Sequence, residues 1–237
     1  MSGVETTIFC LTHDILKREI IITSDGSTTI HLPEWNEHYH SKHGAIQEAY
    51  HVFIKHGLET VSKNELSILE IGFGTGLNAF ITFLEAQKRG LKIQYTGVEA
   101  YPVPEEEVTQ LNYVPELKAK AFSEIFQKIH ATEWEEECVI APSFTLEKKQ
   151  LFFHEIEQEN KFDLIYFDAF GARVQPELWT EDIFILMYKA LKEKGRLVTY
   201  SAKGSVRRAM QAVGFEVERL PGPPGKREML RALKHLH

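Results

Sequence analysis

A glycine-rich segment follows a short apolar run near residue 70 and has the composition of a ligand-binding loop. It reads Glu70-Ile71-Gly72-Phe73-Gly74-Thr75-Gly76 and continues the apolar residues 66–71. Glycines at alternate positions let the backbone turn sharply after a strand and approach a ligand closely. The helix expected over residues 77–89 directs its N-terminus at the same place. The segment therefore predicts a cofactor-binding turn between a strand and a helix.

The spacing of these glycines indicates which cofactor binds. A dinucleotide-binding loop usually has the pattern GxGxxG, with its third glycine one residue later. The GxGxG spacing here, with Glu70 at the strand end, suits the methionine and adenosine of S-adenosyl-L-methionine better than a pyrophosphate. Glu99, at the end of the next strand, can accept hydrogen bonds from both ribose hydroxyls. The alternatives are a nicotinamide cofactor and a generic turn beside a surface glutamate. The residues expected to bind the cofactor here are Glu70, Gly72, Phe73, Gly74, Thr75, Gly76, Asn78, Glu99 and Ala100.

A second candidate group ends another apolar run, where residues 162–167 are followed by Asp168, Ala169 and Phe170. In open parallel sheets, ligands bind beyond the carboxyl ends of the strands, so Asp168 is expected beside the sulfonium of the cofactor. A carboxylate there can hold an amine, orient its lone pair and take its proton, as methyl transfer to nitrogen requires. The Phe170 ring can border the electron-poor methyl sulfonium. The alternative is that Asp168 only caps the next turn.

Alternating strands and helices must position these groups, which predicts a mostly parallel sheet with helices on both faces. A hairpin over residues 18–33 and a helix over 45–57 precede this pattern. We expect residues 1–60 to form an extension on a domain of residues 61–237, with a helical, acidic insertion over about 102–149. The expected strands are 66–71, 93–99, 151–154, 162–167, 195–201, 215–220 and 228–233, and the later helices are 77–89, 181–191 and 205–213.

The bulk composition, with 43% hydrophobic and 26% charged residues in a chain of 237, is ordinary for a globular protein. No run of about 18 apolar residues predicts a membrane span, and the first residues do not resemble a signal peptide. Cys10 and Cys138 are expected to be unpaired thiols in a reducing cytoplasm. The histidines, including His38, His40 and His43, match no zinc-site spacing, so no metal is expected.

Charge is distributed unevenly along the chain. The formal net charge is -7, but residues 203–237 carry eight Lys or Arg and three Glu, a net of +5. The rest of the chain is therefore strongly acidic. The basic tail is either a solvated face or a docking surface for a polyanion.

Four blocks of sequence carry a resemblance to a known family. The chain resembles the methyltransferase part of the bifunctional tRNA-modifying MnmC proteins and their stand-alone MnmD relatives. The blocks are Asn36-Glu37-His38-Tyr39-His40-Ser41 with Gly44, Glu48 and Val52-Phe53; Glu70 to Asn78; Phe167 to Phe170 with Pro176-Glu177-Leu178-Trp179; and Thr199 to Gly204 with Val206-Arg207-Arg208 and Gly225 to Leu230.

The resemblance implies a Rossmann-like methyltransferase fold whose seven-stranded sheet has an antiparallel last strand. It implies N-methylation of the aminomethyl group of 5-aminomethyl-2-thiouridine at the tRNA wobble position. It adds Tyr39 and Ser41 to the cofactor site. Basic residues near the C-terminus are then expected to contact tRNA phosphates, although Lys203, Lys226 and Arg227 could instead line the pocket. The residues expected on the tRNA side are Lys203, Arg207, Arg208, Lys226, Arg227 and Glu228.

The chain departs from the family pattern in several ways. We expect the protein to lack the FAD-dependent oxidase domain of the bifunctional members, so that a separate enzyme or pathway supplies the aminomethyl precursor. Ala172 and Gln175 stand where the family often has proline and asparagine. Only Glu155 substitutes for an expected aspartate after the third strand, so the adenine contact stays unassigned. Two other functions remain open: a small-molecule amine methyltransferase or aminopropyltransferase on the same fold, and a non-catalytic tRNA-binding protein.

Overall fold

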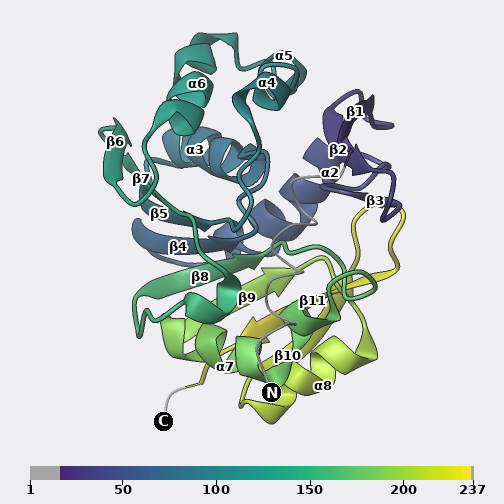
Figure 1. The fold of residues 1–237 in the computed structure, drawn as a ribbon. Coiled ribbons are helices and arrows are strands. Elements are labelled where there is room, and N and C mark those ends of the chain that lie inside the picture. Colours follow the sequence, from purple (N-terminus) through teal and green to yellow (C-terminus); the bar gives the residue numbers. More distant parts are fainter. Residues whose placement is uncertain (1–16, 236–237) are drawn as a thin grey trace, which may run out of the picture.

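A sheet of eight strands forms the centre of the fold (Figure 1). The structure is a computed structural model that describes residues 17–235. The five middle strands are parallel to one another, and the carboxyl ends of β4, β5 and β8 meet at one edge. From one edge to the other the strands are β10 (Glu216–Pro221), β11 (Glu228–Leu233), β9 (Leu191–Thr199), β8 (Phe162–Phe167), β4 (Glu65–Ile71), β5 (Lys92–Val98), β7 (Phe144–Lys149) and β6 (Glu137–Ala141).

The last strand, β11, runs antiparallel to both of its neighbours, β9 and β10. This confirms the expected mostly parallel sheet with an antiparallel last strand. The sheet has eight strands rather than seven because β6 adds antiparallel to β7 at the far edge.

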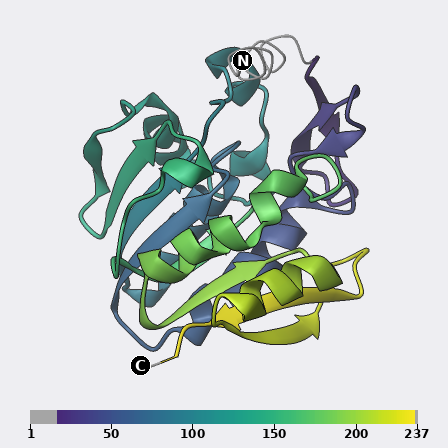
Figure 2. The ribbon, with the colours of Figure 1, turned by 60° about the horizontal axis from the view of Figure 1, so that its bottom comes forward.

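Helices cover both faces of the sheet, as the alternating pattern predicts. On one face lie α2 (Ala45–Ala49), α3 (Leu77–Arg89) and α6 (Ser123–Ala131), and on the other lie α7 (Glu181–Ala190) and α8 (Gly204–Ala212). Figure 2 shows α7 and α8 lying across the strands on their face. Side chains of strand β4 are buried on both faces of the sheet. Ile68 packs in the core beneath α3, and Leu69 packs in the core beneath α7. A strand buried on both faces is largely apolar, and that composition predicts a strand here.

The N-terminal hairpin is confirmed and gains a third short strand. Strands β1 (Glu19–Ile22), β2 (Thr28–Leu32) and β3 (Glu37–His38) form a separate antiparallel sheet. At the turn between β1 and β2, Asp25 Oδ1 accepts a hydrogen bond from the Ser27 amide at 3.1 Å. The helix predicted over residues 45–57 is present as α2 followed by the π-helix η2 (Tyr50–Lys55).

The segment over residues 102–149 is helical only as far as Ala131, where α6 ends. The remainder folds into β6 and β7, and β7, not residues 151–154, is the third parallel strand. The prediction of a strand at 151–154 is wrong, since Phe153–Glu155 forms a 3-10 turn. Strand β7 was not predicted because its sequence contains charged residues. One of them, Lys148, is only 2% exposed, and its Nζ donates a hydrogen bond to the His130 carbonyl at 2.7 Å. The remaining short helices are η3 (Leu58–Thr60), α4 (Glu105–Val108), α5 (Tyr113–Glu116), η4 (Lys120–Phe122), η5 (Phe153–Glu155) and η6 (Pro176–Trp179).

Within residues 17–235, no helix is long and apolar enough to cross a bilayer. The same residues contain no cluster of three or more His, Cys, Asp or Glu side chains arranged to hold a metal ion. Cys138 is a free, partly buried thiol. Cys10 lies outside the described residues.

Candidate active site

The glycine loop lies against the end of β8. Gly72, Gly74 and Gly76 have φ angles of 87°, 49° and 68°, in the left-handed region that favours glycine. A Cβ atom on Gly72 would lie 2.7 Å from the backbone oxygen of Asp168. The two segments approach so closely because the Asp168 amide donates to the Ile71 carbonyl at 2.9 Å. The loop and the candidate catalytic carboxylate are therefore neighbours.

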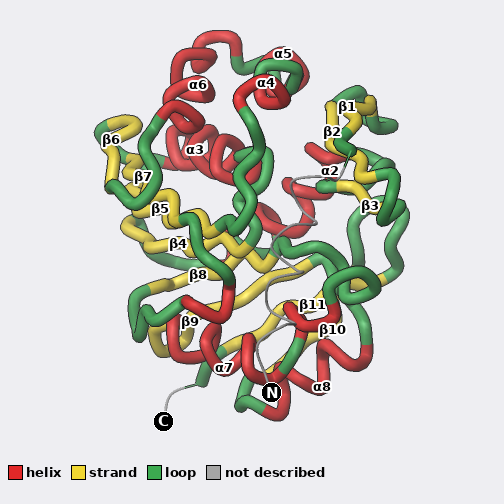
Figure 3. The backbone as a smooth tube through the Cα atoms, in the orientation of Figure 1, coloured by secondary structure: helices red, strands yellow, loops and turns green. Residues whose placement is uncertain are grey.

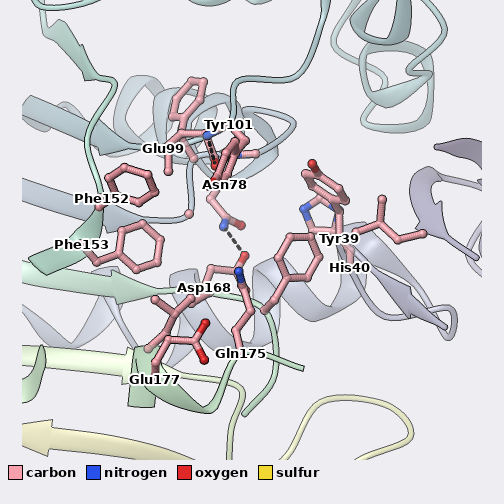
Figure 4. A pocket seen from close by; sticks show the side chains of 18 of the residues that line it. Tyr39, His40, Asn78, Glu99, Tyr101, Phe152, Phe153, Asp168, Gln175 and Glu177 are labelled. Carbon is pink, nitrogen blue, oxygen red and sulfur yellow. Dashed lines mark hydrogen bonds between the residues drawn. The ribbon is translucent and has the colours of Figure 1, made fainter. Parts of the chain in front are cut away.

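A cavity of about 280 Å³ opens where β4, β5 and β8 end (Figure 4). Figure 4 shows Asp168 between Phe152 and Phe153 on one side and Tyr39 and His40 on the other. We call this the cofactor cavity, because it contains most of the residues that the sequence assigns to the cofactor. The predicted site residues that line it are Tyr39, Gly72, Phe73, Gly74, Asn78, Glu99, Ala100, Asp168 and Phe170.

The Glu99 carboxylate is fixed on the wall of the cofactor cavity by backbone amides. Its Oε2 accepts from the Gly74 amide at 3.1 Å, and its Oε1 accepts from the Tyr101 amide at 3.0 Å. Burial raises the pKa of Glu99, and hydrogen bonds from Tyr101 and Gly74 oppose that rise. Because the amides leave acceptor sites on both oxygens, the carboxylate can accept two further hydrogen bonds from a ligand.

Asn78, on the first turn of α3, links two carboxylates. Its Nδ2 donates to Glu70 Oε1 at 2.8 Å and to Asp168 Oδ2 at 2.9 Å, as Figure 4 shows for Asp168. Glu70 is fully buried behind Asn78, where it also accepts from the Tyr95 hydroxyl at 2.8 Å, and it does not line the cavity. Asn78 Oδ1 is buried and has no hydrogen-bond partner among the described residues. An unpaired buried acceptor beside a cavity is a ready contact for a ligand donor.

The pKa of the Asp168 carboxyl is raised to about 7. Burial is the largest cause, and the negative charge of Glu48 adds to it. The hydrogen bond from Asn78 and the positive charge of Lys226 act in the opposite direction. A carboxyl that titrates near neutrality can both accept and release a proton under ordinary conditions.

The raised pKa of Asp168 predicts a stability effect. The folded protein keeps this proton to a higher pH than the unfolded chain, whose ordinary value is 3.8. Its contribution to the free energy of unfolding therefore falls as pH rises from about 4 to about 7 and is flat above. We expect Asp168→Asn to stabilise the ligand-free protein by about 2–4 kcal/mol at pH 8 and by less at pH 5. Denaturant unfolding at both values tests this, and an equal effect at the two would mean that Asp168 titrates normally.

A second cavity, of about 290 Å³, adjoins the first. It is lined by Ser41, Glu48, Tyr200 and Lys226, and we call it the acceptor cavity. Ser41 therefore lies here and not in the cofactor cavity. The two cavities share the residues Tyr39, His40, Asp168, Ala169 and Phe170. Asp168 consequently faces both, which is the arrangement that transfer between two bound molecules requires.

Aromatic rings stand at the boundary of the two cavities. The Tyr39 ring covers Gly74, where a Cβ atom would lie 3.2 Å from Tyr39 Cδ1. Phe170 meets Tyr39 edge-on at 5.0 Å between ring centroids. The Trp179 indole N–H donates to the Phe170 carbonyl at 2.7 Å and fixes that segment. These rings are well placed to border a sulfonium or an ammonium group.

Several predicted residues lie outside both cavities. The Thr75 hydroxyl accepts from Tyr113 at 3.0 Å, and Gly76 packs against His130, so both face the core. Phe73, in the same loop, does line the cofactor cavity, although its ring packs against Gly97. Of the residues expected on the tRNA side, only Lys226 lines either of these two cavities. The others are exposed (Lys203, Arg208, Arg227) or partly buried (Arg207, Glu228).

Several residues that line the cofactor cavity were not predicted from the sequence. The Phe152-Phe153 pair was interpreted as a strand, but both rings line the cofactor cavity. His40 lines both cavities, and burial lowers its pKa to about 4. Glu48 could have been predicted from the sequence, because a carboxylate within the apolar stripe of a helix indicates a functional residue. The other residues of the cofactor cavity that were not predicted include Arg18, Tyr101, His154, Gln175, Glu177 and Leu178.

Comparison with known proteins shows a family for this chain. The sequence profile of a family described as "S-adenosyl-L-methionine-dependent methyltransferase" matches residues 114–235. Two curated relatives, from Marinomonas sp. and Hydrogenovibrio crunogenus, are each named "tRNA 5-methylaminomethyl-2-thiouridine biosynthesis bifunctional protein MnmC". They are 26% and 28% identical over 84% and 81% of this chain. The chain spans only about a third of their length, 31% and 30%.

Two solved structures extend the comparison. The crystal structure of MNMC2 from Aquifex aeolicus has a TM-score of 0.77 and 27% identity, and the match covers 95% of this chain and 74% of that one. Spermidine synthase from Thermotoga maritima has a TM-score of 0.54 and 16% identity, and it covers 93% of this chain and 69% of that one. The second likeness shows the fold alone.

Proposed function

The chain belongs to the family of S-adenosyl-L-methionine-dependent methyltransferases, and we propose that it methylates the aminomethyl nitrogen of 5-aminomethyl-2-thiouridine at the tRNA wobble position. The observation that carries the proposal is the junction of two cavities at Asp168, one with cofactor-binding features and one with acidic and aromatic walls. The names of the curated relatives support the choice of this nucleoside.

The cofactor cavity fits S-adenosyl-L-methionine. In our proposal the Glu99 carboxylate accepts from the ribose hydroxyls, and the unpaired Asn78 Oδ1 accepts from the amino group of the methionine moiety. Glu70 acts through Asn78, whose amide it holds in place. S-adenosyl-L-methionine supplies a methyl group made electrophilic by its bond to a positively charged sulfur.

The chain's own contribution at Asp168 is to bind and orient the amine. A primary amine is a nucleophile only when neutral, so the ammonium form must lose a proton before transfer. The Asp168 carboxylate accepts a hydrogen bond from the ammonium group, takes the proton from its nitrogen and later releases that proton to solvent. The hydrogen bond from Asn78 Nδ2 to Oδ2 keeps the carboxylate in one orientation while it does so.

Transfer of labelled methyl groups tests the proposal. Purified protein is supplied with methyl-labelled S-adenosyl-L-methionine and either tRNA that contains 5-aminomethyl-2-thiouridine, the same tRNA without that group, or free polyamines. The proposal expects label only in the first sample. Label in the polyamines alone would instead support a small-molecule amine methyltransferase. No transfer to any sample, with cofactor binding intact, would contradict an enzymatic role toward amines.

The basic residues around α8 are proposed to contact the tRNA backbone. Lys203, directly before α8, and Arg208, in the middle of α8, are both exposed. The helix follows β9 on the sheet face opposite α3 (Figure 2). We expect Lys203→Glu with Arg208→Glu to weaken tRNA binding and to reduce the slope of log K against log salt by about 2. Lys118→Glu with Lys120→Glu is the matched control, with the same charge change beside α5 and α6 (Figure 1). An equal loss for both pairs would show a general charge effect and no tRNA site at α8.

A further inference from the structure

An ion pair between a buried glutamate and a partly exposed lysine forms one wall of the acceptor cavity. Glu48, on α2, is 6% exposed. Its Oε1 accepts from Lys226 Nζ at 2.6 Å, and its Oε2 accepts from the Ser41 amide at 2.8 Å. Lys226 Nζ also lies 3.8 Å from the centroid of the Tyr200 ring. The lysine is thus held between a carboxylate and an aromatic face.

Lys226 reaches this position from a distant part of the chain. It lies in the turn between β10 and β11, which approaches the β3–α2 segment in Figures 1 and 3. A Cβ atom on Gly225 would lie 2.2 Å from His43 Cδ2, so the turn packs directly on that segment. The Tyr200 hydroxyl donates to the Ala169 carbonyl at 2.8 Å, which anchors the ring beside the end of β8. The lysine and its aromatic support are therefore fixed next to Asp168.

Lys226 has two carboxylates within electrostatic reach. Glu48 holds it, and Asp168 lines the same cavity. The charge of Lys226 lowers the pKa of Asp168, while the charge of Glu48 raises it. Other titratable or charged groups also act on Asp168 or share its cavities. They are Glu70 from β4, Tyr95 from β5, Glu99 and Tyr101 after β5, Tyr200 after β9, Arg18 before β1, Glu37 and His38 from β3, Tyr39, His40 and Lys42 from the β3–α2 segment, and His154 and Glu177 from η5 and η6.

We propose that Glu48 is a positioning residue that holds Lys226 on Tyr200 and away from Asp168, so that the Asp168 carboxylate stays free for the acceptor amine. Without Glu48, the ammonium of Lys226, on its flexible stem, would lose its partner and turn to Asp168, which lines the same cavity. Asp168 would then be occupied by a lysine in place of the substrate. This inference rests on the proposed function for the use made of Asp168.

A second-site rescue tests the inference. We expect Glu48→Gln, whose amide oxygen can still accept from Ser41, to lower kcat by at least about tenfold. In the same variant the pKa of Asp168 should fall by about one unit or more, because the negative charge of Glu48 that raises it is gone and because Lys226 now pairs with Asp168. Adding Lys226→Met should reverse both effects and return kcat to within about tenfold of wild type. Glu48→Gln with Lys42→Met, which removes a rim charge instead, should not rescue.

The pKa is read by carbon NMR of aspartate labelled at the carboxyl carbon, without any substrate. The sequence has five aspartates, and the Asp168→Asn variant assigns the relevant signal. An unchanged titration in Glu48→Gln, or a double variant no more active than the single one, would overturn the inference. The double variant is also informative without the single one, since a kcat more than about tenfold below wild type would mean that the two charges act on the substrate directly. If tRNA is not the acceptor, wild type fails in the tRNA assay while the NMR pattern still holds.

Discussion

Replacing Asp168 by asparagine is expected to lower kcat by about 1,000-fold while S-adenosylhomocysteine still binds. Asparagine keeps the size of the side chain and an oxygen that can accept from Asn78. It cannot take a proton from an ammonium group, and it carries no charge to attract one. The loss should therefore appear in turnover with aminomethyl tRNA, measured at saturating concentrations of both substrates, and only weakly in the affinity for the cofactor product measured by calorimetry.

Asp182→Asn is the matched control for this experiment. Asp182 is exposed in the first turn of α7 and lines neither cavity, so its substitution should leave turnover unchanged. A parallel loss of turnover and of S-adenosylhomocysteine binding in Asp168→Asn would identify Asp168 as a cofactor-binding or structural residue. Proton transfer at the amine would then need another group.

Replacing Glu99 by glutamine is expected to weaken binding of S-adenosylhomocysteine by about 100-fold. Both carboxylate oxygens of Glu99 accept hydrogen bonds from backbone amides, those of Gly74 and Tyr101. Glutamine must turn its NH2 group toward one of those donors, so it loses one internal hydrogen bond as well as the charge that holds a ribose diol. Calorimetric titration of wild type and variant gives the ratio of dissociation constants.

Glu177→Gln provides the comparison for Glu99. It is an exposed carboxylate on the same cavity, so the charge change is equal while the amide contacts of Glu99 are preserved. We expect its dissociation constant to stay within about threefold of wild type. Equal weakening in both variants would indicate a general electrostatic attraction and would remove the specific role of Glu99.

The parts of the site that the sequence predicted depend on local patterns. The glycine loop and Asp168 each follow directly after a largely apolar strand, since helices cover both faces of the sheet, and Glu99 follows a strand that alternates apolar and polar residues. Once parallel strands are recognised, the residues after their carboxyl ends must lie together at one edge. This rule correctly predicts that Asp168 lies beside Gly72, although the two are 96 positions apart in the chain.

The parts that were missed depend on contacts between distant residues. The pairing of Glu48 with Lys226 spans 178 residues, and no local pattern links a carboxylate on one helix to a lysine in a remote turn. Strand β7 was hidden because Lys148 faces inward and hydrogen-bonds to the His130 carbonyl. The assignment of Thr75 to the cofactor rested on the loop motif, which does not reveal that its hydroxyl turns toward Tyr113.

The central claim is the chemical outcome at the wobble nucleoside, and mass spectrometry of digested tRNA tests it most directly. Aminomethyl tRNA is incubated with the protein and S-adenosyl-L-methionine, with the Asp168→Asn variant as the control, and its nucleosides are separated. The proposed function predicts that 5-aminomethyl-2-thiouridine disappears and that a nucleoside heavier by one methyl substitution, 5-methylaminomethyl-2-thiouridine, replaces it only with the wild-type protein. An unchanged wobble nucleoside in the presence of folded, cofactor-binding protein would contradict it.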